Sequence, residues 1–312
     1  MLKVVISEFM DEAAIRAELG GFETLYDPTL VDRPDALHAA LDGAAGLIVR
    51  NRTQVRGALL AAAPRLRAVG RLGVGLDNID LPACAARGIA VHPATGANDG
   101  AVAEYVIGTA LLLLRGAYGA GAQVVAGAWP RNALMGREIG GKRLGLVGFG
   151  AIARETARRA AALDMAVSAF DPHLPPEDAA WRPAHGPVAR AGFEDLIATS
   201  DVLSLHVPLT DATRGMIDSA AIARMTRGAI LINAARGGVA DERAVVEALR
   251  SGHLGGAALD VFAHEPLDAA AGAAFADVPN LILTPHIAGV TQESNVRVSA
   301  VTARAVRRSL GA

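Results

Sequence analysis

The stretch LGLVGFGAIARETARRAAALDMAVSAFDP, residues 144–172, decides the fold of this 312-residue chain. It starts with an apolar run, 144–147, that is typical of a buried strand, and it then turns at a Gly-Phe-Gly sequence. A helical run follows, and a second apolar run, 166–170, ends at Asp171. A strand, a glycine turn, a helix and a second strand form the repeating unit of parallel sheets covered by helices. We therefore expect an α/β protein.

The glycine turn in this stretch has the spacing G-x-G-x-x-A, an alanine-tolerant form of the dinucleotide fingerprint. Gly148 permits the tight turn, Gly150 lets backbone N–H groups approach a pyrophosphate at the helix N-terminus, and Ala153 keeps the helix close to the strand. Asp171 follows Ala153 by 18 residues, where an acid accepts hydrogen bonds from the ribose hydroxyls and repels a 2′-phosphate. The pattern predicts NAD rather than NADP. The alternative is a glycine turn in another kind of α/β protein.

Apolar runs alternate with alanine-rich helical runs on both sides of this stretch. The strands expected in the first third are KVVIS, TLYD, GLIVR, RAVGRLG and IAVHP, and those from about residue 143 are RLGLVGFG, AVSAFD, DVLSLHVP, GAILINAA, GAALDVF and LILTPH. Two such series predict two Rossmann-like or flavodoxin-like parallel-sheet domains separated by a cleft.

The tail from residue 291 reads as one helix with no strand of its own to cover, so we expect it to return to the first domain. The expected domains are therefore 1–97 plus 288–312, which would bind substrate, and 98–287, which would bind NAD. The chain would cross between them twice.

The composition narrows the class of protein. A hydrophobic content of 52% and a charged content of 20% are typical of a globular chain, and the net charge of −2 gives no indication of a nucleic-acid partner. The single cysteine, Cys84, cannot form an internal disulfide, which favours a reducing, cytoplasmic compartment and a buried structural thiol. No close cluster of His, Asp and Glu indicates a metal site.

The longest apolar segment is YVIGTALLLL, residues 105–114, about half of the ~20 residues that a membrane span needs. No membrane association is expected, because the N-terminus also lacks the apolar run of a signal peptide. The helix 103–114 is instead predicted to be buried between domains or subunits, and a homodimer is expected.

Three polar residues follow later strands of the second series: Arg236, Glu265 and His286. Ligands of open α/β sheets bind at these strand ends. An arginine fork binds a carboxylate, a histidine titrates near neutrality, and a carboxylate beside that histidine stabilises the imidazolium. Beside a nicotinamide, this set would interconvert a 2-hydroxy acid and a 2-oxo acid. Individually, each has a structural alternative: Arg236 could pair with Asp241, Glu265 could be a solvated loop acid, and His286 could sit in a proline turn.

The segments INAARGGVADERAV, ALDVFAHEPL, LTPHIAGVTQES and VGRLGVGLDNID, with the fingerprint, resemble the NAD-dependent D-2-hydroxyacid dehydrogenases over essentially the whole chain. The resemblance implies a catalytic triad of Arg236, Glu265 and His286. It also implies NAD contacts at Gly148, Gly150, Ala151, Ile152, Asp171, Val207, Pro208, Ala234, Ala235, Arg236, Asp260 and His286. The family's usual glycine at the last fingerprint position is Ala153 here, a mild departure.

The family's mechanism follows as a hypothesis. Arg236 would grip the substrate carboxylate, and His286 would give a proton to the C2 oxygen during reduction or remove one during oxidation. Glu265 would orient His286, while backbone N–H groups of Val74 and Gly75 would hold the carboxylate. NADH would deliver hydride to C2, and closing of the cleft would exclude water.

The identity of the acid depends on two more cations. Arg50 follows a strand, Arg71 precedes the Val74 turn, and in the family's phosphoglycerate members matching arginines face the substrate. These cations would suit a second anionic group at C3, as in 3-sulfolactate or 3-phosphoglycerate, although both arginines could instead be solvated or pair with local acids. Because the sequence ends at residue 312 without the regulatory domain of many phosphoglycerate dehydrogenases, sulfolactate or a hydroxypyruvate-type substrate is favoured.

Two other functions stay open. One is a hydroxypyruvate or glyoxylate reductase, and the other, of a different class, is a non-catalytic NAD-sensing regulatory protein on the same fold.

Overall fold

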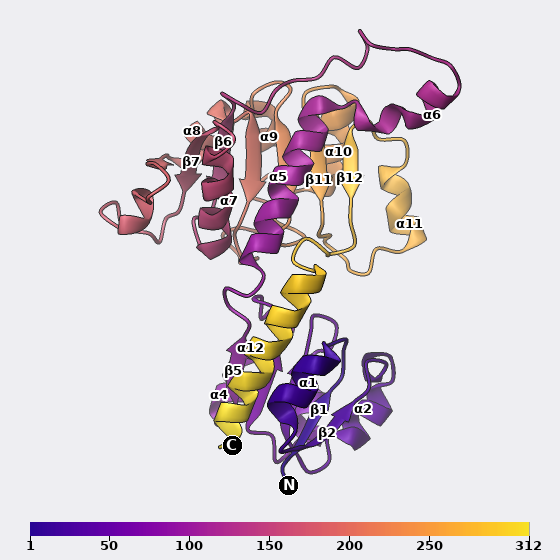
Figure 1. The fold of residues 1–312 in the computed structure, drawn as a ribbon, viewed down its shortest axis with the longest axis vertical. Helices are drawn as coiled ribbons and strands as arrows, with labels where there is room; N and C mark the ends of the chain where they lie inside the picture. Colours follow the sequence, from indigo (N-terminus) through magenta and orange to yellow (C-terminus); the bar gives the residue numbers. More distant parts are fainter. Residues whose placement is uncertain (312) are drawn as a thin grey trace. The chain divides into compact units, whose positions relative to one another are not determined.

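The computed structural model describes residues 1–311, which form two compact units. The first comprises Met1–Asn98 and Val290–Ala312, and the second comprises Asp99–Gly289. Each unit contains one sheet in which every strand pair is parallel (Figure 1). The α/β class predicted from the alternating runs is thus confirmed.

The sheet of the first unit has the order β2-β1-β3-β4-β5. Its elements are β1 (Lys3–Ile6), α1 (Glu12–Leu19), β2 (Glu23–Tyr26), a 3₁₀ turn (Leu30–Asp32), α2 (Pro34–Ala40), β3 (Ala44–Val49), α3 (Gly57–Ala62), β4 (Ala68–Arg71), α4 (Leu81–Ala86), β5 (Ala90–Pro93) and α12 (Gln292–Leu310). The strand order reverses direction between β1 and β3, so loops leave these two strands in opposite directions along the sheet.

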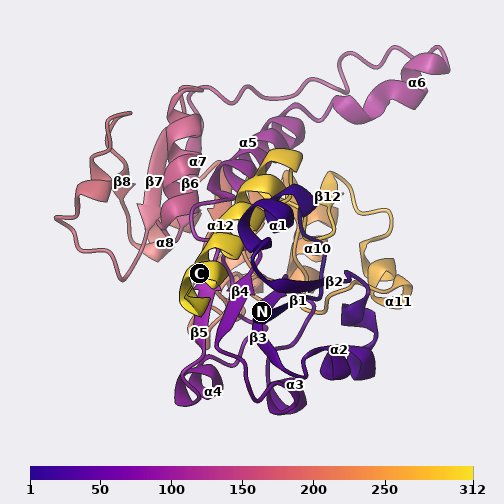
Figure 2. The ribbon, with the colours of Figure 1, turned by 60° about the horizontal axis from the view of Figure 1, so that its bottom comes forward.

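Two hydrophobic clusters cover the faces of this sheet. Alternate residues of β1 and β3 point to opposite faces, as the two-residue period of a strand requires. One face packs against α2, α3 and α4, and the other against α1 and α12 (Figure 2). Cys84 is buried in the first of these clusters. The tail helix therefore covers strands that lie more than two hundred residues earlier in the chain.

The sheet of the second unit has the order β12-β11-β10-β9-β6-β7-β8. Its elements are α5 (Asp99–Arg115), a 3₁₀ turn (Tyr118–Ala120), α6 (Gly121–Val125), β6 (Arg143–Val147), α7 (Ala151–Ala161), β7 (Ala166–Phe170), a 3₁₀ turn (Ala179–Trp181), β8 (Ala189–Arg190), α8 (Phe193–Thr199), β9 (Val202–Leu205), α9 (Ser219–Arg224), β10 (Ile230–Asn233), α10 (Glu242–Arg250), β11 (Gly256–Leu259), α11 (Ala269–Gly272), a 3₁₀ turn (Ala273–Phe275) and β12 (Leu281–Leu283). Here the order reverses between β6 and β9.

Helices cover both faces of this second sheet. Ile230 and Ile232 of β10 face the cluster formed with α5 and α7, whereas Leu231 faces the cluster formed with α8, α9 and α10. The apolar helix expected between domains or subunits is α5, and most of its apolar side chains are buried against α7 and the sheet of its own unit. Burial of α5 against a second subunit stays a prediction.

No single helix in the described part of the chain is long and apolar enough to cross a membrane. The helical segments Asp99–Arg115 and Tyr118–Val125 are long and apolar enough for a span only when they are taken together, and the chain bends by 65° between them.

Candidate active site

The fingerprint turn lies where the strand order of the second unit reverses, after β6 and beside the end of β9. Gly148 has a φ of +88°, and a Cβ there would lie 2.5 Å from the carbonyl oxygen of His206. Gly148 thus meets both requirements for glycine, the left-handed backbone and the close approach. Val207 and Pro208 continue from β9 at this point.

The helix that follows the turn begins at Ala151. Its N-cap is Gly150, and no side chain of the described chain accepts a hydrogen bond at this cap. A Cβ at Gly150 would meet no atom within 4 Å, so the backbone there is open to a ligand. Uncapped N–H groups at the start of an 11-residue helix suit a phosphate, and this end of α7 therefore fits the pyrophosphate of a dinucleotide.

Asp171 follows β7 and is held by two backbone N–H groups. Oδ2 accepts from Phe149 N at 2.9 Å, and Oδ1 accepts from His173 N at 2.9 Å. A carboxylate oxygen has two acceptor sites, so each oxygen keeps one for another donor. The carboxylate is thus fixed beside the glycine turn with capacity for two hydroxyl groups, as a ribose diol requires.

The turn that carries Arg236 follows β10. Asn233 closes it, because its side chain accepts from Ala235 N and donates to the carbonyl oxygen of Arg236. Arg236 Nη1 donates to the carbonyl oxygen of Ala235 at 2.6 Å. Asp241, which the structural alternative pairs with Arg236, caps α10 by accepting from Arg243 N and Ala244 N.

The two glycines after Arg236 serve different purposes. A Cβ at Gly237 would lie 1.8 Å from the carbonyl oxygen of Phe262, so only glycine allows this close contact. Gly238 has a φ of +77°, in the left-handed region that favours glycine. The contact at Gly237 packs the Arg236 turn against the loop that carries Glu265.

Glu265 and His286 form a hydrogen-bonded pair. Glu265 Oε2 lies 2.7 Å from His286 Nδ1, and Glu265 Oε1 accepts from Phe262 N at 3.0 Å. Partial burial raises the pKa of Glu265, but the hydrogen bonds from His286 and Phe262 and the charge of Arg236 outweigh it and lower the pKa. Glu265 is therefore a carboxylate that fixes one ring nitrogen of His286 and leaves the other available.

Asp260 holds the loop on which His286 lies. This residue follows β11 and is 1% exposed. Its Oδ1 accepts from Ile287 N at 2.8 Å, and its Oδ2 accepts from Ala288 N at 2.9 Å. The carbonyl oxygen of Asp260 accepts from His286 N at 2.8 Å. The loop is thus bonded to Asp260 through both side chain and backbone.

In the first unit, a buried carboxylate organises the loop after β3. Glu8 is 4% exposed and accepts three backbone N–H groups: Arg50 N at 2.8 Å, Thr53 N at 3.0 Å and Arg52 N at 3.1 Å. The loop lies where the strand order of this sheet reverses, the position at which open α/β sheets bind ligands. Glu8 thereby fixes the backbone from which Arg50 extends.

The two arginines of this loop differ in their partners. Arg52 forms an ion pair with Asp32 at the surface. Arg50 donates from Nη2 to Asn295 Oδ1 at 2.6 Å, and its guanidinium lies over the Phe9 ring at 5.7 Å from the centroid. Burial lowers the pKa of Arg50, although the charge of Glu8 raises it. No carboxylate in residues 1–311 forms an ion pair with Arg50.

Arg71 ends β4, the strand that pairs with β3. Its Nη1 donates to the carbonyl oxygen of Leu72 at 3.2 Å, and it lies 1.6 Å from where a Cβ at Gly73 would be. The side chain therefore folds over the turn that continues into Val74 and Gly75, both half-buried. Arg50, Arg71 and this turn share one edge of the first sheet.

Sequence reasoning missed several residues of these sites. Glu8 and Phe9 directly follow the strand KVVIS, and their position after a strand was the available signal. Asn295 lies 245 positions from Arg50, and no local pattern connects them. Thr284 and Tyr105 were also missed.

Comparison with known proteins identifies the family. The family model described as D-isomer specific 2-hydroxyacid dehydrogenase, NAD binding domain, matches residues 107–288. The chain belongs to this family. It is an NAD-linked oxidoreductase of the 2-hydroxyacid class, as the resemblance of its motifs predicted.

Individual proteins of known activity are also similar to this chain. The chain is 54% identical to an (S)-sulfolactate dehydrogenase of Chromohalobacter salexigens over 100% of this chain and 99% of the relative. It is 40% identical to a D-3-phosphoglycerate dehydrogenase of Mycobacterium leprae over 90% of this chain, but it spans only 52% of that relative. Among solved structures, the D-lactate dehydrogenase of Aquifex aeolicus complexed with NAD and lactic acid aligns with a TM-score of 0.84 at 26% identity, over 99% of this chain and 95% of that one.

Proposed function

We propose that the protein interconverts a D-configured 2-hydroxy acid and its 2-oxo acid, and that the substrate carries a second anionic group at C3. The favoured substrate is 3-sulfolactate, with 3-phosphoglycerate as the other dianionic candidate. Similarity to the sulfolactate dehydrogenase along the whole of both chains supports this order. Hydroxypyruvate and glyoxylate are the monoanionic alternatives.

The surroundings of Arg50 are the single observation that favours a substrate with two anionic groups. Arg50 is a partly buried cation that hydrogen-bonds to a neutral amide and lies over an aromatic ring. Within residues 1–311, its buried Nε has no hydrogen-bond partner. Taking a guanidinium out of water without an anion is costly, so a substrate anion at Arg50 would recover that cost. Arg52, two residues further along the same loop, pairs with Asp32 instead.

The proposed binding residues fall into two groups. Arg50 and Arg71 would bind the anion at C3, while N–H groups of Val74 and Gly75, together with Arg236, would hold the carboxylate. For NAD, the proposed residues are the start of α7 at Gly148, Gly150, Ala151 and Ile152, the ribose acceptor Asp171, and Val207, Pro208, Ala234, Ala235, Arg236, Asp260 and His286. NAD supplies the hydride acceptor or donor when it is bound.

We assign the acid–base step to His286. Its Nδ1 is engaged by Glu265, so Nε2 is the nitrogen that would give a proton to the C2 oxygen during reduction and take it back during oxidation. Glu265 stabilises the protonated ring, because its lowered pKa keeps it negatively charged. Arg236 orients the carboxylate and polarises the C2 oxygen. These three side chains therefore have separate roles in one reaction.

A substrate screen tests the proposal. NADH oxidation is measured with sulfopyruvate, phosphohydroxypyruvate, hydroxypyruvate, glyoxylate and pyruvate, using wild type, Arg50→Ala and the matched control Arg52→Ala. We expect sulfopyruvate to have the highest kcat/KM, and Arg50→Ala to lower it about 10- to 100-fold, as for a lost charge-assisted hydrogen bond. Arg52→Ala should change it less than about 2-fold, as for an exposed ion pair. Equal losses on pyruvate and sulfopyruvate would overturn the dianion assignment, and no turnover with any acid would favour the NAD-sensing alternative.

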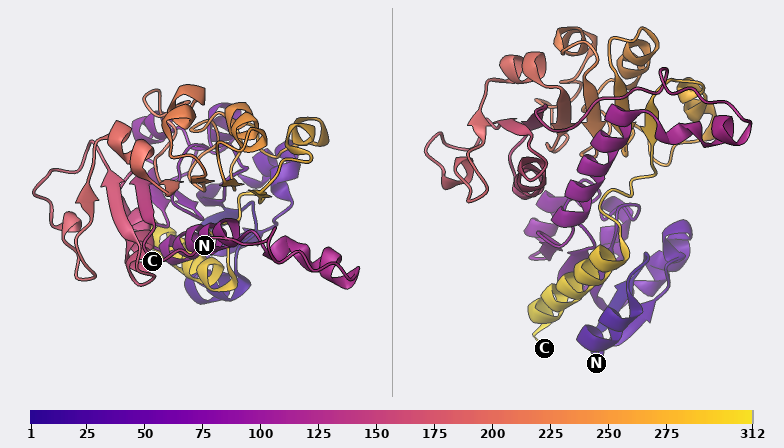
Figure 3. Two further views of the ribbon diagram at one scale, coloured as in Figure 1. Left: turned by 90° about the horizontal axis from the view of Figure 1, so that it is seen from above. Right: turned by 45° about the horizontal axis from the view of Figure 1, so that its top comes forward.

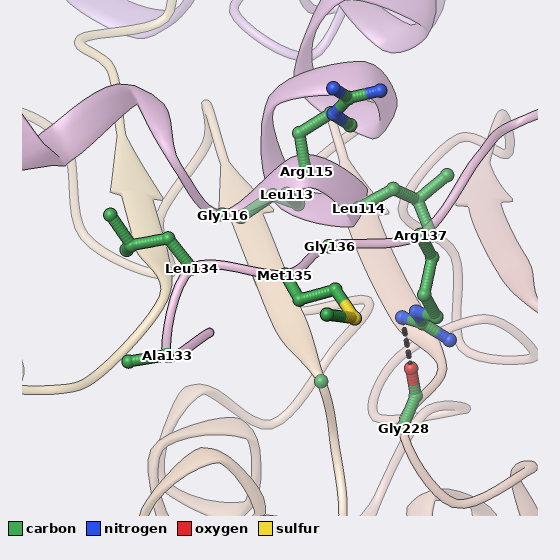
Figure 4. Close-up of a pocket in the computed structure, with 11 residues that line it drawn as sticks. Leu113, Leu114, Arg115, Gly116, Ala133, Leu134, Met135, Gly136, Arg137 and Gly228 are labelled. Atoms are coloured by element: carbon green, nitrogen blue, oxygen red, sulfur yellow. Dashed lines mark hydrogen bonds between the residues drawn. The ribbon is translucent and has the colours of Figure 1, made fainter. Parts of the chain in front are cut away.

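We also propose that the protein is a homodimer whose protomers associate through residues 116–136. This segment extends away from the sheet of the second unit (Figure 3) and exposes large apolar side chains, including Val125 at 91%, Met135 at 79% and Trp129 at 75%. At its base lies a cavity of about 450 Å³ lined by Leu113, Leu134 and Met135, where Arg137 Nη2 donates to the carbonyl oxygen of Gly228 at 2.6 Å (Figure 4). A second copy would cover this apolar surface. The molar mass of the protein in solution tests this proposal, and a mass of twice that of one chain is expected.

A cytoplasmic location is proposed on the composition alone. Its support is the single cysteine, Cys84, which is buried and cannot form an internal disulfide.

A further inference from the structure

The backbone of His286 requires support from its surroundings. His286 has a φ of +54°, a left-handed conformation that residues other than glycine seldom adopt. Such a conformation persists when neighbouring contacts over-determine it. Asp260 provides some of these contacts through the N–H groups of His286, Ile287 and Ala288.

Two hydroxyl groups extend this support to a distant helix. Thr284 Oγ1 donates to Asp260 Oδ1 at 2.6 Å, and Tyr105 Oη lies 2.7 Å from Thr284 Oγ1. A hydroxyl has one hydrogen, and that of Thr284 goes to the carboxylate. Tyr105 must therefore be the donor to Thr284. Because Tyr105 lies on α5, 179 positions before Thr284, the chain of bonds connects the His286 loop to a long buried helix.

We infer that Tyr105 and Thr284 are positioning residues for catalysis: the chain Tyr105→Thr284→Asp260 fixes the loop backbone and thereby the direction of the His286 ring. The inference rests on the proposed acid–base role of His286. Neither hydroxyl contacts the ring itself, so both act through Asp260 and the loop.

The ring and the hydroxyl of Tyr105 have different contacts, so its positioning role can be tested separately from its packing. The ring of Tyr105 packs against the core cluster beneath α5, and a phenylalanine ring would keep those contacts. Only the hydroxyl reaches Thr284. Burial raises the pKa of Tyr105 to about 12, so the hydroxyl keeps its proton throughout the working pH range. Removing the hydroxyl alone therefore tests the chain of hydrogen bonds without opening a cavity.

The contacts of Asp260 are compatible with its proposed contact to NAD. Oδ1 accepts from Thr284 and Ile287, which uses both of its acceptor sites, whereas Oδ2 accepts only from Ala288. One acceptor site on Oδ2 is left for a further donor. The Thr284 hydroxyl and a ligand amide would thus use different oxygens of Asp260, and the two contacts can be separated by experiment.

The experiment compares Thr284→Val with its matched control Thr284→Ser, which keeps the hydroxyl, and adds Tyr105→Phe. Turnover of the best 2-oxo acid, its KM, the Kd of NADH, the pH profile and the melting temperature are measured in the full-length protein. We expect Thr284→Val to lower kcat about 10- to 100-fold, the scale of a misplaced catalytic group, with KM and the Kd of NADH changed less than about 2-fold. Thr284→Ser should retain at least about a third of kcat, and Tyr105→Phe should lower kcat about 3- to 10-fold, as for one lost hydrogen bond.

Three outcomes would overturn the inference. One is Thr284→Val with wild-type kcat. Another is Thr284→Ser as impaired as Thr284→Val, and the third is a loss that appears in NADH binding rather than in kcat. If Thr284→Val does not fold, Tyr105→Phe decides alone, because its ring packing is retained. Persistent turnover in His286→Gln would instead remove the proposed acid–base role, so the two failures are distinguishable.

Discussion

Both sheets reverse their strand order at one place, but the backbone N–H groups at the two places have different partners. In the second unit, the reversal between β6 and β9 carries glycines, and the N-terminus of α7 has no side-chain cap. In the first unit, the reversal between β1 and β3 carries Glu8, whose carboxylate accepts the N–H groups of Arg50, Arg52 and Thr53. One position leaves its backbone donors for a ligand, and the other satisfies them internally.

The difference explains how each unit can bind an anion. Backbone N–H groups bind phosphate only where the protein supplies no acceptor of its own, as at Gly150. In the first unit Glu8 has already taken that place, so an anion there must be bound by side chains. Arg50, whose side chain has no carboxylate partner within residues 1–311, is the residue available for this.

The largest effect is expected from a substitution at the proposed catalytic histidine of the second unit. His286→Gln keeps a side chain that can hydrogen-bond but removes the titrating ring, so kcat should fall about 10²- to 10⁴-fold, the usual contribution of a general acid. Steady-state kinetics with the best 2-oxo acid measure the loss, and fluorescence titration should show that the Kd of NADH changes far less than kcat. Turnover near the wild-type rate would show that another group supplies the proton.

An intermediate effect is expected from Glu265→Gln, and it depends on pH. Glu265 has a lowered pKa, so in the wild type its negative charge persists as the pH falls and is lost only below the ordinary range of a glutamate. A neutral glutamine no longer stabilises the protonated His286, which reduction requires. The kcat for reduction should therefore be about 10- to 100-fold lower in the variant near neutral pH, as for a lost charge-assisted hydrogen bond. The two proteins should become more alike only below the ordinary range of a glutamate, where wild-type Glu265 is itself protonated. Profiles of kcat against pH, recorded over the same buffers, measure the difference, and superimposable profiles would contradict it.

The smallest effect is expected from a substitution of Glu8, which tests whether this carboxylate satisfies the backbone N–H groups of the first unit. Glu8→Ala leaves three backbone N–H groups without their acceptor, and the free energy of unfolding should fall by about 1–3 kcal/mol. The KM of dianionic acids should rise several-fold while kcat changes little, because Arg50 loses its fixed backbone. Acetate, which can enter the vacated place, should partly restore both properties, whereas acetamide, of the same shape but neutral, should not. Equal rescue by both would argue against the anion-for-anion exchange.

Much of the fold could be predicted because its signals are local. Each expected strand run overlaps a strand of one of the two sheets, since apolar runs separated by helical segments have few other solutions. The strand β8 was missed because it has two residues, both exposed, and no apolar pattern. The packing of α5 against α7 could not be predicted, because an apolar helix does not indicate which neighbour covers it.

The candidate site was predictable to the extent that its residues end strands. Arg236, Glu265 and His286 were chosen on that basis; the structure places Glu265 Oε2 2.7 Å from His286 Nδ1, and the roles of the three residues stay predictions. The supporting residues depend on strand order, which brings Glu8 next to a loop 42 positions away and Thr284 next to a helix 179 positions away. No pattern within a single sequence encodes such pairings.

The contact between Gly237 and the carbonyl oxygen of Phe262 has a consequence for how the enzyme can change over evolutionary time. It couples the turn that bears Arg236, proposed to bind the substrate carboxylate, to the loop that bears Glu265, proposed to orient His286. A lineage that altered one of them to accept a different acid could not enlarge residue 237 without displacing the other. New specificities would therefore arise more readily at Arg50 and Arg71, where side chains can be exchanged while the turn and the loop in contact at Gly237 are inherited unchanged.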